Sequence, residues 1–156
     1  MSKAPQIRKE STTFRLEPIT KYTAEVGARI LRKNLTNYIE WAMEESFKNV
    51  KFADGSPLSD QINNLWDIDE ADRFVKLAYT YPTLLNYDEQ RLLKTINENF
   101  AVFKKNTENF IASNPEQEAA FQANLPMLEF IDFKKVRDRW EHLNNYVFGK
   151  EDLDLS

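Results

Sequence analysis

The pattern of hydrophobic and polar positions changes its period within residues 11–47. Residues 11–17 alternate, with one side formed by Thr12, Phe14 and Leu16 and the other by Ser11, Thr13, Arg15 and Glu17. A period of two predicts a β-strand with one buried face. Pro18 then ends the strand, because proline lacks a backbone donor and suits the first turn of a helix.

Two amphipathic helices are predicted after this strand. The first carries apolar residues at helical spacing, namely Ile19, Tyr22, Val26 and Ile30. The second begins after Asn34, and its apolar face contains Leu35, Tyr38, Ile39, Ala42, Met43 and Phe47. One short strand and two helices are too few to bury a core of their own. The segment therefore needs a partner, which is either the rest of the chain or a second copy.

Residues 8–48 resemble the ribbon-helix-helix family, the Arc/MetJ-type DNA-binding proteins. The resemblance rests on the alternating strand that ends in Leu16-Glu17-Pro18, a first helix of about four turns, and the turn and second-helix start from Asn34 to Ile39. It implies that two chains pair their strands into an antiparallel ribbon that enters the major groove of double-stranded DNA. Members often carry a glycine between the helices. Arg32-Lys33 occupy that turn here, so a tight left-handed turn is less expected.

The resemblance also implies roles for individual residues. The outward strand residues Thr13, Arg15 and Glu17 would read bases, since arginine pairs with guanine O6 and N7, threonine offers a hydroxyl or methyl group, and a carboxylate can accept from cytosine N4. The expected phosphate-binding residues are Arg8, Lys9, Asn34, Leu35 and Thr36, the last three at a helix start whose free N–H groups suit an anion. The expected core of the homodimer contains Phe14, Leu16, Val26, Ile30 and Ile39. The alternatives are a merely solvated strand face and an ordinary Asn34 helix cap.

The charge distribution favours a nucleic-acid-facing end. The chain has a net charge of −4, yet residues 1–33 hold eight basic and three acidic residues, a net charge of +5. The remainder therefore carries −9. Such an asymmetry is typical of a chain with one end that faces nucleic acid. A basic N-terminus is also common in proteins that bind no ligand.

The rest of the chain is predicted to be helical, so the fold class is mostly α. We expect a ribbon-helix-helix module over residues 1–50, a linker over 51–56 that contains Asp-Gly and Ser-Pro, a helical bundle domain over 57–149 and an acidic tail over 150–156. Long helices are predicted over 87–111 and from Pro126 to Gly149. Aromatic residues within them, such as Phe100, Phe103 and Phe110, are expected in the core.

The composition limits the kinds of binding or catalytic site that the chain can form. The absence of cysteine excludes disulfides and thiolate metal sites, and the scarcity of glycine disfavours a phosphate-binding loop. His142 is the only histidine, and the acidic group from Asp67 to Asp72 lacks the spacing of a calcium-binding loop. We therefore expect no catalytic residues, no metal and no cofactor, and hence no enzyme. The basic run from Lys134 to Arg139 is either a solvated helix face or a second DNA contact.

The sequence thus predicts a sequence-specific DNA-binding homodimer. The family's roles include transcriptional repressor, which we take as the broadest expectation, antitoxin, and accessory protein of plasmid partition or transfer. The C-terminal domain would mediate further oligomerisation or contact a protein partner. No segment predicts a membrane span or a secretory signal, which suits a cytoplasmic protein. The alternative is a helical protein-interaction module that binds no DNA.

Overall fold

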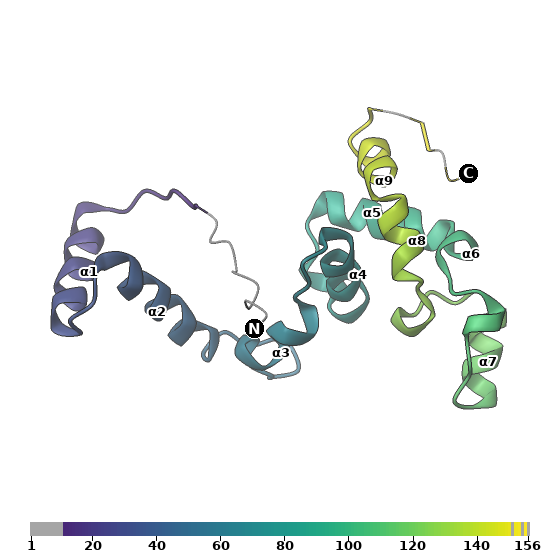
Figure 1. Cartoon of the computed structure of the whole chain (residues 1–156), viewed down its shortest axis with the longest axis horizontal. Helices are drawn as coiled ribbons and strands as arrows, with labels where there is room; N and C mark the ends of the chain where they lie inside the picture. Colours follow the sequence, from purple (N-terminus) through teal and green to yellow (C-terminus); the bar gives the residue numbers. More distant parts are fainter. Residues whose placement is uncertain (1–10, 151, 154, 156) are drawn as a thin grey trace, which may run out of the picture. The chain divides into compact units, whose positions relative to one another are not determined.

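The computed structural model describes residues 11–150, 152, 153 and 155, and this part of the chain is mostly helical and contains no β-strand (Figure 1). The prediction of a mostly α fold is confirmed. The chain divides into two compact units, residues 1–60 and 61–156, here called unit 1 and unit 2. Each is described by itself below.

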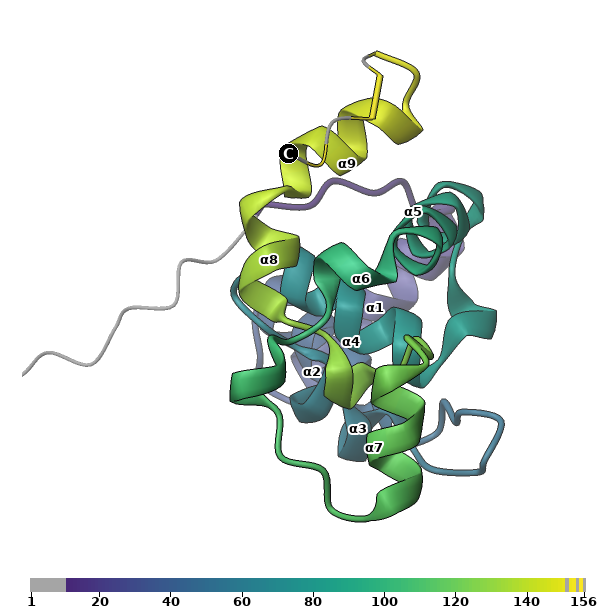
Figure 2. The same cartoon turned by 90° about the vertical axis from the view of Figure 1, so that its right-hand side faces the viewer.

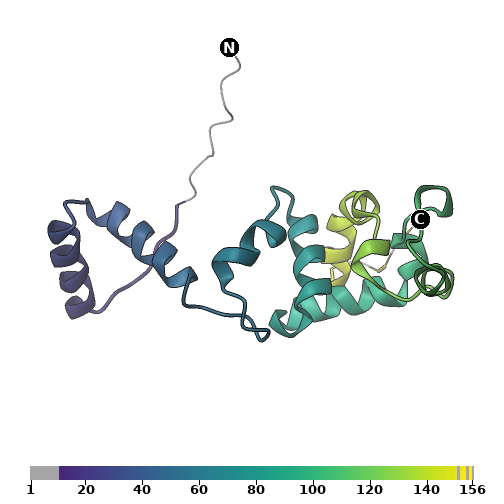
Figure 3. The same cartoon turned by 90° about the horizontal axis from the view of Figure 1, so that it is seen from below.

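Unit 1 is built around a pair of helices, α1 (Pro18–Ile30) and α2 (Leu35–Phe47), which are neighbours joined by a short turn (Figures 1 and 3). Both helices begin where the sequence predicts. Pro18 stands at the start of α1, where its missing N–H costs no helical hydrogen bond. Asn34 caps α2, because its side-chain oxygen accepts a hydrogen bond of 2.8 Å from the Asn37 N–H.

The predicted linker forms an ordered loop. Lys51 and Pro57 form an isolated antiparallel bridge, and Gly55 lies in the left-handed region at φ +85°. Asp54 accepts hydrogen bonds from the backbone and the hydroxyl of Ser56, and these bonds lower the pKa of Asp54. Helix α3 (Leu58–Leu65) follows, and the division between the two units falls within it.

The described part of unit 2 contains six further helices, which are labelled in Figure 2. It also holds all the buried apolar residues of the described chain except Ala28. The six helices are α4 (Glu70–Thr80), α5 (Tyr87–Glu98), α6 (Phe100–Phe103), α7 (Pro115–Gln122), α8 (Phe133–Asp138) and α9 (Trp140–Val147). Single 3-10 turns cover Pro82–Leu84, Thr107–Asn109 and Leu128–Phe130. The largest side chains with essentially no exposed surface are those of Val75, Ile96, Phe103, Phe121, Phe130, Ile131, Val136, Leu143 and Val147.

The structure divides both long helices that the sequence predicts for unit 2 into shorter elements, so their predicted lengths are wrong. The helix that starts at Tyr87 ends at Glu98, and after α6 the chain is extended at Lys104. The segment from Pro126 to Gly149 forms a 3-10 turn and then two helices, which meet at Arg139 with φ −113° and ψ 8°. Tertiary pairing outweighs helix propensity here. Lys104 forms an antiparallel bridge with Ile131, in which the Lys105 N–H donates to the Phe130 carbonyl and the Asp132 N–H donates to the Phe103 carbonyl.

Candidate nucleic-acid interface

The predicted reading strand is an exposed segment that leads into α1. All of residues 11–17 are exposed, and Glu17 has extended backbone angles of φ −62° and ψ 147°. Thr13, Arg15 and Glu17 are thus accessible side chains. A strand is defined by hydrogen bonds to a neighbouring strand, and a single chain supplies none beside this segment within its described part. The ribbon itself therefore remains a prediction.

The predicted phosphate-binding residues fall into two groups. Arg8 and Lys9 lie outside the described residues. Asn34, Leu35 and Thr36 form the start of α2, where the backbone N–H groups of the first turn have no acceptor within the helix. Asn34 and Thr36 are exposed, and no acidic residue stands in the first turn.

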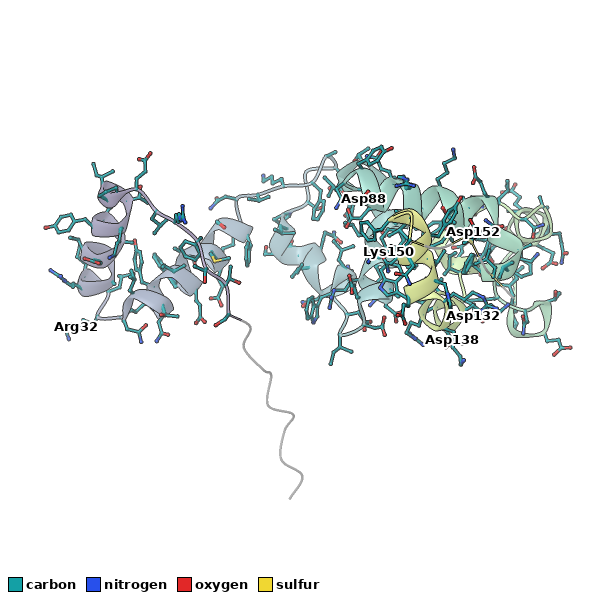
Figure 4. All side chains as sticks on the ribbon, turned by 90° about the horizontal axis from the view of Figure 1, so that it is seen from above. Arg32, Asp88, Asp132, Asp138, Lys150 and Asp152 are labelled. Atoms are coloured by element: carbon teal, nitrogen blue, oxygen red, sulfur yellow. The ribbon has the colours of Figure 1, made fainter. Side chains whose placement is uncertain are left out.

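The turn before α2 contains Arg32 and Lys33, as the sequence predicts, and adds positive charge beside the helix start. Arg32 adopts the left-handed conformation at φ +53°, and it lies in the turn between α1 and α2 (Figure 4). Its N–H donates to the Arg29 carbonyl, and the Lys33 N–H donates to the Ala28 carbonyl at 2.8 Å. This is the Schellman arrangement in which a helix usually ends on glycine. The tight left-handed turn therefore forms without glycine, and it sets Arg32 and Lys33 immediately before the start of α2.

The predicted dimer core is uncovered in the single chain. Phe14, Leu16 and Ile30 are exposed by 53%, 41% and 74%, and Val26 and Ile39 are half-buried. Within the described part of unit 1, Ala28 is the one buried residue. Further large apolar side chains are exposed on the same unit, namely Ile19, Tyr22, Leu31, Met43 and Val50. Exposed large apolar side chains on one folded unit are typical of a site of association.

Gly27 is a residue that sequence reasoning missed. It lies in α1 against the ring of Tyr38 in α2, and a Cβ atom at position 27 would lie 2.5 Å from Tyr38 Oη. The available signal was a glycine within a helical pattern, which often marks a close approach. The contact fixes how closely α1 and α2 pack, and thereby where the start of α2 lies relative to the segment that precedes α1.

The basic run in unit 2 is engaged within the protein. Lys134 pairs with Asp138, Arg137 pairs with Asp72 on α4, and the Arg139 Nε–H donates to the Leu155 carbonyl. Lys135 donates to the Lys104 carbonyl and to Asn106 Oδ1, each at 2.8 Å. Lys134 and Arg137 remain exposed, which agrees with the solvated helix face that the sequence suggests, and Lys135 and Arg139 are half-buried. A second contact to DNA stays the alternative.

The two remaining candidates from the sequence are the acidic group from Asp67 to Asp72 and His142. Within the described residues, no three histidine or acidic side chains are grouped so that they would hold a metal ion. The carboxylate of Asp67 instead accepts a hydrogen bond of 2.7 Å from the Lys76 ammonium group, which lowers the pKa of Asp67, and Asp69 caps α4. His142 is exposed on α9.

Comparison of the chain with protein-family models, with curated proteins and with solved structures finds no match. Among the described residues, no helix combines the length and the apolar character that crossing a bilayer requires.

Proposed function

We propose that this chain is a sequence-specific DNA-binding protein, a transcriptional repressor of the ribbon-helix-helix kind that acts as a homodimer. Residues 11–17 of two copies pair into an antiparallel ribbon, and the ribbon enters the major groove. The observation that carries the proposal is the uncovered apolar surface of unit 1 beside an exposed, extended segment.

A second copy of the chain meets two needs of unit 1 at once. The extended segment needs a strand to pair its backbone groups, and Phe14 and Leu16 need a surface that covers them. Antiparallel pairing of two identical segments brings both pairs of side chains to one side of the ribbon. The α1 and α2 helices of both copies then lie under that side, which gives a two-fold symmetric interface.

The opposite side of the ribbon carries the groups that read bases. Alternation places Thr13 and Arg15 together on this side, with Glu17 at its end. Arg15 supplies a bidentate donor for guanine, and Thr13 supplies a hydroxyl or methyl group. Glu17 accepts from cytosine N4 where the operator offers it.

The start of α2 then holds a phosphate on the DNA backbone. The backbone N–H groups of Leu35 and Thr36 point along the helix axis, while that of Asn37 is bound by the Asn34 cap, and the helix dipole favours an anion there. Arg32 and Lys33 add two positive charges directly before that turn. The overall charge distribution supports this orientation, since unit 2 holds 11 basic and 17 acidic residues, a net charge of −6. Unit 2 serves assembly or contact with a protein partner.

The rival function is a helical protein-interaction module, in which a different protein covers the apolar surface of unit 1. The two functions differ in the oligomeric state of the pure protein. Sedimentation of the full chain at micromolar concentration gives a dimer under our proposal and a monomer under the rival one.

Selection of bound sequences from random duplex DNA tests the proposal directly, and two variants separate base reading from phosphate contact. Arg15→Ala should weaken binding to the selected site by about 1–3 kcal/mol and relax its sequence preference. Lys9→Ala should weaken binding to all duplexes alike and lower the salt slope by about one unit. Equal effects of the two changes on selected and random DNA would show that the ribbon does not read bases.

A further inference from the structure

The acidic segment that follows α9 lies against the body of unit 2. Leu153 and Leu155 are half-buried and pack against the core of the unit, whereas Asp152 is exposed. The carbonyl of Leu155 accepts a hydrogen bond of 3.3 Å from the Arg139 Nε–H. The described residues of this segment are therefore docked on the surface of unit 2 through their leucines.

A left-handed glycine turns the chain back toward this surface. Gly149 has φ +69°, a conformation that glycine adopts without strain. The Lys150 N–H donates to the Asn145 carbonyl at 2.8 Å, as in the Schellman arrangement of a helix end. The chain turns back after α9 (Figure 2), and Leu155 reaches Arg139, which directly precedes the first residue of that helix. The end of α9 thus directs the segment to its docking place.

Arg139 brings a positive charge to the contact. Its Nε–H donates to a carbonyl, and among the described residues no carboxylate forms an ion pair with it. The segment itself is acidic in sequence, with Glu151, Asp152 and Asp154 around the two leucines. A cation at the docking place of an acidic segment gives charge complementarity, which favours an acidic peptide over a basic one.

We propose that unit 2 carries a docking site for a short acidic peptide with two leucines separated by one residue, and that this segment of a second copy binds there when the resident segment is displaced. The site, here called the tail-docking surface, comprises Arg139 and the part of the core surface that contacts Leu153 and Leu155. Alternate residues of an extended peptide lie on one face, so both leucines can contact one surface. Exchange of an identical element between copies preserves every contact.

The resident segment is held by few contacts, so a competing segment can displace it. Within the described residues these contacts are one hydrogen bond and two leucines that stay partly exposed. The turn at Gly149 keeps the segment next to its site and raises its effective concentration there. A second copy therefore competes with a weak but local occupant. The tail-docking surface lies in unit 2 and does not depend on the DNA contacts proposed for unit 1.

The test is calorimetric titration of the full chain with the synthetic peptide KEDLDLS, which copies residues 150–156. The titration compares the wild type with the double variant Leu153→Ser/Leu155→Ser, whose own segment can no longer compete. We expect one saturable site in the double variant and an affinity at least about tenfold lower in the wild type, since a resident segment that leaves about a tenth of the sites open weakens binding by that factor. Both leucines lie outside the fully buried core, so the double variant should stay folded, which thermal melting checks.

Two controls identify what the tail-docking surface recognises. A peptide in which serine replaces both leucines should show no saturable binding to the double variant. Arg139→Gln, added to the double variant, should weaken binding of KEDLDLS about tenfold, the loss of one hydrogen bond from a charged donor. Lys134→Gln is the matched control, because it removes an exposed cation that is already paired with Asp138, and it should change the affinity by less than about twofold.

Amide chemical shifts of the wild-type chain give a second readout that needs no variant. At saturating KEDLDLS, the signals of Leu153 and Leu155 should move toward random-coil positions, because the peptide displaces the resident segment. Unchanged signals at saturation would overturn the exchange.

Three results of the titrations would overturn the proposal. They are no saturable binding to the double variant, equal affinity of the wild type and the double variant, and equal binding of the serine peptide. Equal binding of a peptide with amides in place of its carboxylates would overturn the assignment to an acidic peptide. None of these measurements involves DNA, so their failure is distinguishable from a failure of the proposed function.

Discussion

Gly27 and Tyr38 pack so closely that the glycine leaves no room for a side chain. A Cβ atom at position 27 would lie 2.5 Å from Tyr38 Oη and 2.6 Å from Tyr38 Cζ. Both atoms belong to a rigid ring, so the ring would have to move as a whole. The contact joins the two helices of a unit that otherwise buries little within the single chain.

Gly27→Ala should therefore lower the stability of unit 1 by about 1–3 kcal/mol, the usual cost of overpacking. Helix propensity alone predicts the opposite sign, because alanine is favoured over glycine in a helix by roughly 1 kcal/mol. Amide hydrogen exchange in α1 and α2 measures the change. In a Tyr38→Ala background the clash is gone, and the same substitution should be stabilising. A stabilising effect in the wild-type background would contradict the packing described here.

Arg32→Gly should stabilise the turn between α1 and α2 by about 0.5–1 kcal/mol, because a left-handed conformation is strained in arginine and relaxed in glycine. The same change removes a cation next to the proposed phosphate contact. We thus expect thermal stability to rise while affinity for duplex DNA falls at low salt. Lys33→Gly serves as the control, since that position is not in the left-handed region, and it should lose affinity without gaining stability. A rise of both thermal stability and affinity for duplex DNA in Arg32→Gly would argue against a phosphate contact at this turn.

Leu16→Ala should weaken the proposed dimer. The side chain is 41% exposed in the single chain, so its truncation costs little there. If the second copy buries it, the loss is roughly 2–5 kcal/mol. The variant should then melt at a lower temperature than the wild type, and sedimentation should show monomers at concentrations at which the wild type is a dimer. An unchanged monomer–dimer equilibrium would separate Leu16 from the interface.

Arg137→Ala should destabilise unit 2 by about 1–3 kcal/mol, because it removes the partner of a buried carboxylate. Asp72 is only 7% exposed, and its Oδ1 has no hydrogen-bond partner within the described part of the chain. Lys134→Ala breaks a surface pair and is the control, with an expected cost within about 0.5 kcal/mol.

The cost of Arg137→Ala should depend on pH. Burial raises the pKa of Asp72 above its ordinary value of 3.8, although the charge of Arg137 acts against this shift. The folded state therefore binds the Asp72 proton more tightly than the unfolded state, and stability falls as pH rises through that raised pKa. Removal of Arg137 raises the pKa further, so the loss should be larger at pH 7 than below pH 3.8. Urea unfolding at both pH values measures the free energy of unfolding that Arg137→Ala removes. An equal loss at both pH values would contradict the role of Arg137 as the partner of the charged Asp72.

Capping residues in the sequence are sufficient to locate the starts of many helices. Asn34, Asp69 and Asn114 each precede a helix, and each side chain accepts a hydrogen bond from the first turn that it caps. Asn86 adds a full capping box with Glu89. These signals act within four residues, so they are legible in a single sequence.

Other features depend on distant parts of the chain. No proline or glycine marks the end of the helix at Glu98. The chain leaves the helical path because Lys104 pairs with Ile131, which is distant in the sequence. The hydrogen bond from Lys135 Nζ to the carbonyl of Lys104 depends on the same pairing, because it spans 31 positions of the chain. A ribbon between two copies is harder again to predict from local sequence signals, because its hydrogen bonds join two different chains.

The bridge between Lys104 and Ile131 closes the segment 105–130 into a loop whose ends are tied by backbone hydrogen bonds at 2.8 Å and 2.9 Å. Ile111, 91% exposed, lies on this loop before α7, while Phe121 and Phe130 anchor it in the core. A single protease cut near Ile111 would therefore leave two fragments that stay together in native conditions and separate only in denaturant. The same position should tolerate an inserted tag or reporter domain, because the loop ends remain fixed whatever its length.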